Sequence, residues 1–376
     1  MNTFPEIKKN FGFGAMRLPM KDDKIDIEEL CRMTDLFIES GFNYFDTAHG
    51  YHEGASETAL RQALTSRHRR DEYLLVNKLT HGMFELNPEG VRKFFQMQLE
   101  ACGVDYFDFY LMHSQTLNYY EDFKRAHAYE TAFQLKAEGK IRHVGMSFHD
   151  HAEVLDRILT EYPDIELVQL QFNYVDYNDA GIQARQCYEV CEKHDKPVVV
   201  MEPVRGGALA RLPESAQEVL DALTATDTVK PSAASYAIRY AASFPRNIMV
   251  LSGMSNLEQM RDNIGFMKDF KPLDASEFAA VERVCEIFRA QNLIACTACR
   301  YCTAGCPMNI SIPDLISDMN NQKVFKTWNS EWYYTVHTLS NGKASECIAC
   351  GQCESVCPQH LPIISLMEQI SAEFEK

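Results

Sequence analysis

Residues 27–46 of the 376-residue chain read IEELCRMTDLFIESGFNYFD. Through Ile27–Ser40 the apolar residues recur every three to four positions, which is typical of an amphipathic helix. A glycine then separates this segment from the short apolar run Phe42–Asp46, which has the length and aromatic content of a strand. The stretch therefore predicts a helix followed by a buried strand that ends in a polar residue.

The same alternation of short apolar runs and helical segments continues to about residue 265. The expected strands are Phe11–Leu18, Phe42–Asp46, Tyr73–Lys78, Phe107–His113, His143–Ser147, Leu167–Gln171, Pro197–Met201 and Ile248–Ser252. The expected helices include Ile27–Ser40, Gly90–Ala101, Phe123–Ala137, Ile182–Lys193 and Ser232–Ala242. Because strands that alternate with helices form parallel sheets, and eight such units fit in about 250 residues, the fold class is α/β and a closed (β/α)8 (TIM) barrel is favoured. The alternative, an open doubly wound sheet, needs a glycine fingerprint after the first strand that Gly12-Phe13-Gly14 does not complete.

The chain has 13 cysteines, and eight of them form two runs with the same spacing, C-x2-C-x2-C-x3-C-P. This spacing is that of ferredoxins with two 4Fe-4S clusters, in which the fourth cysteine of each run ligates the other cluster. One cluster is therefore expected on Cys296, Cys299, Cys302 and Cys357, and the other on Cys347, Cys350, Cys353 and Cys306. Zinc is the alternative, but a zinc site pairs two CxxC knuckles and has no use for two identical four-cysteine runs.

These runs predict a second domain. We expect a barrel over residues 1–291, ending in a helix from Leu273 to about Gln291, and a mostly helical ferredoxin-like iron–sulfur domain over residues 292–376. Between the two runs we expect helices at Pro313–Val324 and Glu331–Leu339, with Trp328, Trp332, Tyr333 and Tyr334 packing this insertion against the clusters or the barrel. The other cysteines are expected to be small buried apolar residues, namely Cys31, Cys102, Cys187, Cys191 and Cys285.

Charge and hydropathy exclude some classes of function. With 37 Lys and Arg against 53 Asp and Glu, the net charge is −16, which argues against binding nucleic acid. No run of 18 or more apolar residues is present, so no membrane-spanning helix is expected. The first residues, Met1–Glu6, lack the basic-then-apolar pattern of a signal peptide, so a cytoplasmic location is expected.

Polar residues mark the ends of consecutive predicted strands. Asp46, Lys78, His113 and Ser147 end the second to fifth strands, and Gln169 lies within the sixth. The carboxyl ends of barrel strands form one mouth, where TIM-barrel enzymes have their active sites. The sequence therefore predicts a catalytic site at this mouth, and we expect His49, His52 and His149 near it.

These residues carry a family resemblance. Phe45-Asp46-Thr47-Ala48-x-x-Tyr51, Lys78 at a strand end and Tyr110-Leu111-Met112-His113-Ser114 resemble the catalytic tetrad of the aldo/keto reductase family, over about residues 10–290. The resemblance, to a subfamily with a C-terminal two-cluster domain, implies catalysis by Asp46, Tyr51, Lys78 and His113. It also implies an NADP or NAD site with Ser147 and Gln169 on the carboxamide and with further contacts from Arg205, Gly206, Gly207, Leu209, Gly253, Ser255, Gln259, Asp262 and Asn263.

The chemistry suits these residue types. The phenol of tyrosine has a pKa of about 10, and a neighbouring ammonium such as that of Lys78 is expected to lower it. Asp46 would hold Lys78 charged, Tyr51 would act as general acid to a carbonyl oxygen, and His113 would position that oxygen. Three departures from the family pattern bear on the nicotinamide site: Phe148 follows Ser147, Met201-Glu202 ends the seventh strand, and Gly253 and Gln259 stand where basic residues often bind a 2′-phosphate.

Three functions remain open at this point. The first is NAD(P)H-linked reduction of a small carbonyl compound, or oxidation of an alcohol, with the two 4Fe-4S clusters serving structure or electron transfer. Because nicotinamide transfers two electrons and a cluster one, the second is a one-electron reductase fed by ferredoxin or another electron-transfer partner, without bound nicotinamide. The third is a non-catalytic electron carrier on a barrel scaffold.

Overall fold

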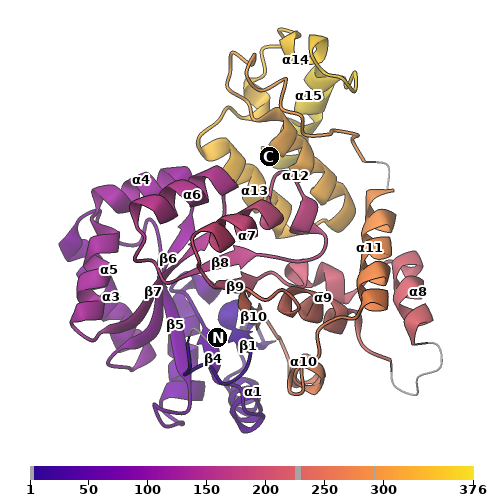
Figure 1. The fold of residues 1–376 in the computed structure, drawn as a ribbon. Helices are drawn as coiled ribbons and strands as arrows, with labels where there is room; N and C mark the ends of the chain where they lie inside the picture. Colours follow the sequence, from indigo (N-terminus) through magenta and orange to yellow (C-terminus); the bar gives the residue numbers. More distant parts are fainter. Residues whose placement is uncertain (1–3, 225–229, 291–292) are drawn as a thin grey trace.

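In the computed structural model, which describes residues 4–224, 230–290 and 293–376, eight parallel strands close into a barrel with helices outside it and a helical C-terminal region at one end (Figure 1). The order around the barrel is β1-β10-β9-β8-β7-β6-β5-β4, so β1 closes the sheet between β10 and β4. The barrel strands are β1 (Phe11–Gly14), β4 (Tyr44–Asp46), β5 (Leu74–Leu79), β6 (Phe107–Gln115), β7 (Ile141–Phe148), β8 (Leu167–Gln171), β9 (Val198–Met201) and β10 (Asn247–Ser252). All eight predicted runs are strands, and the predicted TIM barrel is confirmed.

Helices surround the barrel and form the C-terminal region. They are α1 (Ile27–Glu39), α2 (Ala55–Leu60), α3 (Pro88–Cys102), α4 (Leu117–Arg125), α5 (Ala128–Ala137), α6 (Ala152–Glu161), α7 (Ala184–Lys193), α8 (Glu214–Leu223), α9 (Ala233–Ala242), α10 (Leu257–Met267), α11 (Ala275–Arg289), α12 (Ile312–Phe325), α13 (Trp328–Leu339), α14 (Gln352–Ser355) and α15 (Ile363–Phe374). A small hairpin pairs β2 (Met20–Lys21) with β3 (Lys24–Ile25).

Two predicted elements differ from the structure. The segment Phe123–Ala137 is not one helix, because the chain takes a left-handed conformation at His127 (φ 51°), which separates α4 from α5. The first strand ends at Gly14 rather than Leu18, and Ala15–Arg17 form a short 3-10 turn. The predicted end of α11 near Gln291 lies outside the described residues.

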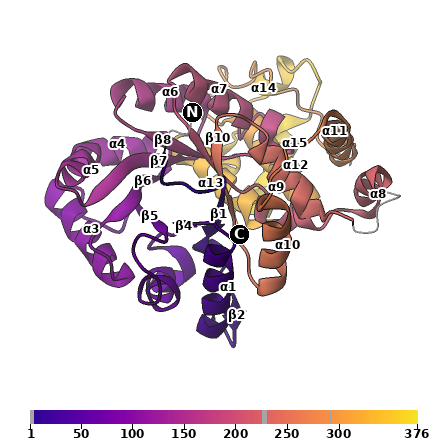
Figure 2. The same ribbon diagram turned by 60° about the horizontal axis from the view of Figure 1, so that its bottom comes forward.

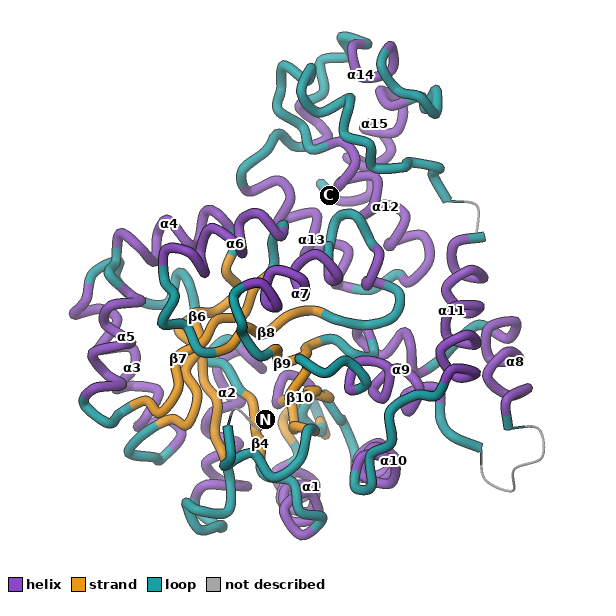
Figure 3. The backbone as a smooth tube through the Cα atoms, viewed as in Figure 1, coloured by secondary structure: helices purple, strands orange, loops and turns teal. Residues whose placement is uncertain are grey.

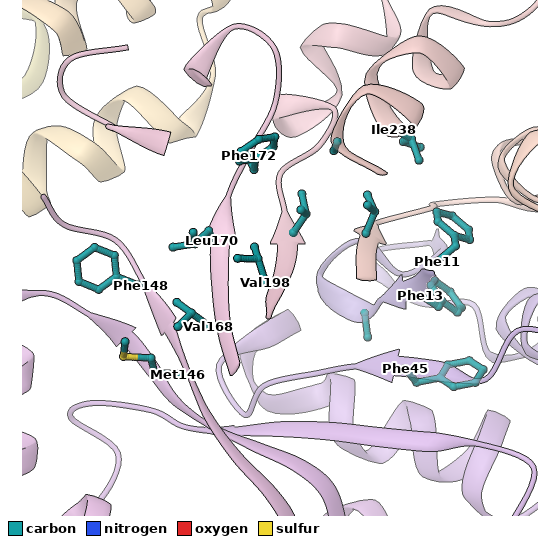
Figure 4. Packing of buried hydrophobic residues seen from close by; sticks show 14 of the residues in the cluster. Phe11, Phe13, Phe45, Met146, Phe148, Val168, Leu170, Phe172, Val198 and Ile238 are labelled. Carbon is teal, nitrogen blue, oxygen red and sulfur yellow. The ribbon is translucent and has the colours of Figure 1, made fainter. Parts of the chain in front are cut away.

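Strand alternation divides the apolar residues into an inner and an outer layer. Tyr44, Val76, Phe109 and Leu167 pack inside the barrel, and Phe4 near the N-terminus packs against them. The alternate strand residues pack outward against the helices, and Figure 4 shows members of this outer layer, among them Phe11, Phe13, Phe45, Val168 and Leu170.

The inner layer leaves no room for a further side chain on β7. A Cβ on Gly145 would stand 2.8 Å from both Leu111 and Leu167, so glycine is needed for this packing.

The C-terminal region has a core of its own and also packs on the barrel. Ile312, Leu315 and Ile316 of α12 and Met367 and Ile370 of α15 form this second core. The cysteine-bearing segments are mainly loops at the far side of these helices, as Figure 3 shows. In the view along the barrel in Figure 2, α13 lies in line with the middle of the barrel. Within the described ranges, none of the helices combines the length and apolarity that crossing a lipid bilayer requires.

Candidate functional site

The inward-facing positions become polar at the carboxyl ends of the strands. On β5 the inner residues are Leu74, Val76 and then Lys78, and on β6 they are Phe109, Leu111 and then His113. Because side chains repeat with period two along a strand, each polar residue lies one step above the apolar floor of the barrel. The mouth therefore collects the predicted polar groups from separate strands.

Lys78 is the centre of this group and is fully buried. Its Nζ donates to Asp46 Oδ1 at 2.6 Å, to the carbonyl of Thr47 at 2.8 Å and to the hydroxyl of Tyr51 at 3.3 Å. Tyr51 begins a short 3-10 turn, Tyr51–Gly54, just after β4, and its ring meets that of His113 edge-on at 6.1 Å. The structure thus brings all four residues of the predicted tetrad together.

The electrostatics of the tetrad differ from the expectation in one respect. Burial raises the pKa of the Tyr51 phenol, and the Lys78 ammonium opposes this without reversing it. Burial alone would lower the pKa of Lys78, but the Asp46 carboxylate and Tyr51 outweigh it and raise that pKa. Lys78 lowers the pKa of Tyr51 as expected, but the net shift is upward, because the unfavourable desolvation of the phenolate outweighs the effect of one ammonium. The resting site therefore holds a charged lysine beside a protonated tyrosine.

His113 is held as a neutral imidazole. Burial, together with the Lys78 ammonium, keeps the pKa of His113 well below its ordinary value. Its Nδ1 is 2.9 Å from the hydroxyl of Thr80, which leaves Nε2 for another partner. A neutral imidazole can offer one N–H to an oxygen placed beside Tyr51.

A cavity of about 300 Å³ opens at this mouth. Its lining includes the predicted site residues Asp46, Tyr51, His113, Ser147, Gln169 and Gly253. It also includes five residues that were not predicted as site residues, Met16, Arg17, Glu202, Trp328 and Trp332, together with His149, which was expected nearby. Phe148 does not line it and packs instead in the outer apolar layer.

Ser147 and Gln169 lie side by side on β7 and β8, where they are register partners. The hydroxyl of Ser147 accepts the backbone N–H of Ser114 at 2.7 Å and keeps its own proton to donate. The amide nitrogen of Gln169 donates to Asp46 Oδ2 at 3.2 Å, which leaves its carbonyl oxygen as an acceptor. A hydroxyl donor beside an amide acceptor suits a carboxamide such as that of nicotinamide.

The loop after β9 contains the predicted glycine pair, but its arginine, Arg205, does not line the cavity. Gly206 and Gly207 take left-handed conformations in a 3-10 turn, Arg205–Ala210. Arg205 is 1% exposed, and Leu209 is buried in the core. The guanidinium of Arg205 pairs with Asp176 at 2.9 Å and lies 4.0 Å from the centre of the Phe325 ring on α12. The predicted cofactor contact from Arg205 therefore finds no support in the geometry, because this side chain joins the barrel to the C-terminal region.

The predicted adenosine-binding residues form one cluster around the start of α10. Gln259 accepts the backbone N–H of Ser255 at 2.8 Å, and the hydroxyl of Ser255 donates to the carbonyl of Arg17 at 3.1 Å. Asn263 is buried and donates to Ser252, whereas Asp262 accepts from Ser232 at the surface. The structure keeps Ser255 and Gln259 exposed beside the mouth and turns Asn263 inward.

Arg17 and Glu202 form a partly exposed charged pair at the mouth, and neither was assigned a site role from the sequence. Arg17 Nη2 lies 3.8 Å from Glu202 Oε1. In the part of the chain that the structure describes, neither Arg17 Nη2 nor Glu202 Oε2 has a hydrogen-bond partner. Burial raises the pKa of the Glu202 carboxyl, and Arg17 opposes this only in part.

Arg17 lies between two glycines of the mouth. A Cβ on Gly206 would stand 3.4 Å from Arg17 Nη2, and one on Gly253 would stand 3.1 Å from the Arg17 side chain. A guanidinium nitrogen that has no hydrogen-bond partner and lies between two glycine loops fits an anionic group such as a pyrophosphate. The feature of the sequence that could have identified Arg17 is its position just after the first strand.

Trp328 and Trp332 reach the cavity from α13, which belongs to the C-terminal region. These two residues are the only tryptophans of the chain. The indole Nε1 of Trp332 donates to Nδ1 of His149 at 3.4 Å. They were expected to pack the insertion against the clusters or the barrel, and no local pattern places them at the mouth.

The eight motif cysteines line two separate cavities. One cavity is lined by Cys296, Cys299, Cys302 and Cys357, and the other by Cys306, Cys347, Cys350 and Cys353. Each set combines three cysteines of one run with the fourth of the other, and both cavities have apolar walls that include Ile312 and Ile363. Four thiolates around an apolar cavity fit a cubane cluster.

Among the residues that the structure describes, no group of three or more His, Cys, Asp or Glu side chains converges as a single metal ion would require. Of the other cysteines, Cys31 is half-buried and Cys102, Cys187, Cys191 and Cys285 are buried, in keeping with a packing role.

Comparison with known proteins agrees with both halves of the chain. The profile of the Aldo/keto reductase family matches residues 10–286, and that of a 4Fe-4S dicluster domain matches residues 295–362.

The chain is 26% identical over 282 residues to an uncharacterized oxidoreductase, YqkF, of Bacillus subtilis, an alignment that covers 67% of this chain and 85% of that protein. It is 24% identical over 261 residues to the NADH-specific methylglyoxal reductase of Escherichia coli, with coverages of 60% and 78%.

Solved structures share the barrel. The holo form of the aldo-keto reductase AKR11C1 from Bacillus halodurans matches with a TM-score of 0.58 and 23% identity over 73% of this chain and 91% of that one. An aldo/keto reductase from Klebsiella pneumoniae in complex with NADP and acetate matches with a TM-score of 0.59 and 19% identity, over 73% and 90% of the two chains. At these identities the likeness shows the fold.

Proposed function

This chain belongs to the aldo/keto reductase family, and from that membership we propose that it reduces a carbonyl compound, or oxidises the corresponding alcohol, with NADPH or NADH at the barrel mouth. It is an oxidoreductase whose C-terminal region is a 4Fe-4S dicluster domain. The observation that carries the proposal is the Lys78 ammonium, which contacts both the Asp46 carboxylate and the Tyr51 hydroxyl at the edge of the cavity.

The tetrad supplies the proton and positions the carbonyl oxygen. A bound nicotinamide supplies hydride to the carbonyl carbon. Tyr51 donates its proton to the carbonyl oxygen as negative charge develops there. Its raised pKa keeps it protonated beforehand, and Lys78 stabilises the phenolate that remains. Asp46 keeps Lys78 charged, and neutral His113 donates a hydrogen bond to the same oxygen.

The nucleotide is proposed to extend from the barrel interior to the start of α10. Ser147 and Gln169 would hold the carboxamide, because they present a donor and an acceptor side by side. Arg17 would bind a phosphate between Gly206 and Gly253. The exposed Ser255 and Gln259, with Asp262 and Asn263 of α10, are proposed for the adenosine end, and Gly207 is proposed for the pyrophosphate loop. The E. coli relative is named as NADH-specific and the K. pneumoniae structure contains NADP, which supports a nicotinamide cofactor without choosing between the two.

The cluster domain is proposed to occupy residues 292–376, behind a barrel of residues 1–291. The two four-cysteine sets that line separate cavities would each hold one 4Fe-4S cluster. A bound cluster supplies or accepts one electron at a time. A soluble electron-transfer partner such as ferredoxin would therefore dock on this domain. A cytoplasmic location is part of the proposal, because thiols stay reduced there.

The test compares Tyr51→Phe with Tyr119→Phe in cluster-loaded protein purified without oxygen. Tyr119 stacks on His81 at 4.0 Å and is not a lining residue of the cavity, so it is a matched control. Oxidation of NADPH and NADH with a panel of carbonyl compounds should fall by roughly 10²–10⁴-fold in Tyr51→Phe and stay unchanged in Tyr119→Phe. Nucleotide binding should survive in both variants. If neither nucleotide binds to the unmodified protein, the proposal fails.

A one-electron reductase without nicotinamide is the second candidate. It is favoured by the position of α13: a Cβ on Gly206 would stand 3.6 Å from Trp328 Nε1, so this helix lies against the loop that is proposed to face the pyrophosphate. Met201 and Glu202, a departure from the family pattern at the end of β9, also line the cavity, which favours the same candidate. This candidate predicts turnover by chemically reduced protein in the absence of any nucleotide.

A further inference from the structure

The helix α13 connects two parts of the molecule that the sequence keeps apart. It lies between the two cysteine runs, yet Trp328 and Trp332 line the cavity at the barrel mouth. Its neighbour Tyr333 packs into the barrel core, and the His337 imidazole approaches the carbonyl of Gly181, a barrel residue, at 3.4 Å. These contacts hold the indole of Trp332 against the loop after β7.

The contact between Trp332 and His149 determines which nitrogen of His149 carries a proton. Burial, together with the Lys78 ammonium, lowers the pKa of His149 to about 4, so the imidazole is neutral near pH 7. A neutral imidazole has one donor and one acceptor nitrogen, whereas an indole N–H can only donate. Because Trp332 Nε1 donates to Nδ1, the proton of His149 is on Nε2.

This Nε2–H is available at the cavity. His149 lines the cavity, and among the described residues no partner takes its Nε2. The backbone N–H of His149 donates to the carbonyl of Gln115 at 3.0 Å, which fixes the base of the side chain. The site near Tyr51 therefore has two neutral imidazoles, His113 and His149. The two are close enough that His149 contributes to the lowered pKa of His113.

We propose that Trp332 of the C-terminal domain makes His149 a second hydrogen-bond donor beside His113, and that the site prefers carbonyl compounds with another acceptor oxygen on the adjacent carbon. His113 and Tyr51 serve the reacting oxygen, and His149 Nε2–H serves the neighbouring one. The indoles of Trp328 and Trp332, with Met16 and Met201, form an apolar wall suited to a flat aryl substituent. The preferred class is an aryl vicinal dicarbonyl or α-hydroxyketone. This inference rests on the proposed carbonyl reduction and names its substrate class.

The test uses two probes with the same carbon skeleton. Acetyl benzoyl has two adjacent carbonyls beside a phenyl ring, and propiophenone has only one. The unmodified protein should prefer the dicarbonyl, and Trp332→Phe, which keeps a ring but loses the N–H, should reduce that preference roughly tenfold. In a His149→Gln background, the amide N–H donates whether or not Trp332 is present, because an amide has no alternative tautomer to select. Trp332→Phe should therefore leave the preference unchanged in that background.

Binding gives a readout independent of turnover. Because both tryptophans of the chain line the cavity, quenching of their fluorescence reports the binding of each probe, and Trp328 remains as the reporter in Trp332→Phe. In Trp332→Phe the dicarbonyl should lose roughly tenfold more affinity than propiophenone, because only the dicarbonyl uses the hydrogen bond from His149. Equal losses for the two probes, or an unchanged preference in folded Trp332→Phe, would overturn the inference. Absence of turnover with an intact binding preference would instead overturn the proposed function alone.

Discussion

Tyr333 and Tyr334 are consecutive residues of α13 whose side chains pack into two different cores. Tyr333 belongs to the barrel core, and Tyr334 belongs to the core that contains Cys302 and Cys353. The hydroxyl of Tyr334 also accepts the backbone N–H of Ala344 and donates to Glu375. One helix therefore joins the cluster domain, the barrel and the cavity.

The first prediction concerns the pairing of the cysteines. If each cluster takes its fourth ligand from the other run, the double variant Cys299→Ser/Cys357→Ser removes ligands from one cavity only. Its iron content should fall by about half, from two cubanes to one.

The comparison variant for this pairing is Cys299→Ser/Cys306→Ser. Its two cysteines line different cavities, so both clusters should be weakened and most of the iron lost. Iron analysis and visible absorption of anaerobic protein measure the cluster content of the two double variants. The reverse result, with half the iron retained by the second variant, would mean that each run holds its own cluster.

The second prediction concerns the buried ion pair of Lys78 and Asp46. Lys78→Met leaves the Asp46 carboxylate buried without its cation, which should cost about 3–5 kcal/mol of the free energy of unfolding. Lys78→Met/Asp46→Asn should recover a large part of that loss, because no unpaired charge remains. Denaturant titration of cluster-loaded protein measures the two values, and equal losses in both variants would show that packing, rather than charge, dominates.

The third prediction concerns Arg17. Because its buried Nη2 atom has no hydrogen-bond partner and lies between Gly206 and Gly253, Arg17→Ala should weaken nucleotide binding by roughly 10–100-fold. Tryptophan fluorescence measures the affinity. Arg92→Ala, which removes a surface pair with Glu138, is the control and should bind normally. Unchanged affinity in Arg17→Ala would exclude a phosphate at this position.

The fourth prediction concerns the pH dependence of the docking of α13. Burial alone would lower the pKa of His337, but Asp318, with Asp314 and Asp150, raises it to about 9. A folded pKa above the unfolded value of about 6.5 means that the stabilisation is complete below that pH and is lost as the pH rises through about 9. The free energy of unfolding should therefore fall between these values.

His337→Asn tests this assignment. The variant should be less stable near pH 6 and should have a flatter pH dependence up to pH 9, measured by denaturant titration at each pH. Asp318 accepts from His337 Nδ1 at 2.8 Å, and the ring of His151 stacks on that of His337 at 5.7 Å, so both belong to the same network. An unchanged slope in His337→Asn would assign the pH dependence to another group.

Much of the fold and part of the site followed from local sequence patterns. The eight strands, the positions of Lys78 and His113 above the apolar floor and the two cysteine runs each depend on periodicity or spacing over fewer than 20 residues. Strand pleating puts every second residue inside the barrel, so the order of residues along a strand already determines which side chains face the mouth.

Other features depend on contacts that no local pattern encodes. Trp332 and His149 are 183 residues apart, and they meet only because α13 packs against the barrel. Arg205 belongs to a predicted phosphate loop, yet docking of α12 brings the Phe325 ring over its guanidinium. Burial, which only the folded chain creates, turned the expected lowering of the Tyr51 pKa into a rise. The sequence alone therefore determined the strands, the polar residues that they carry and the spacing of the cysteines, because these are local. The tertiary structure decided which of these residues reach the cavity and how they are charged there, because both depend on packing between distant segments.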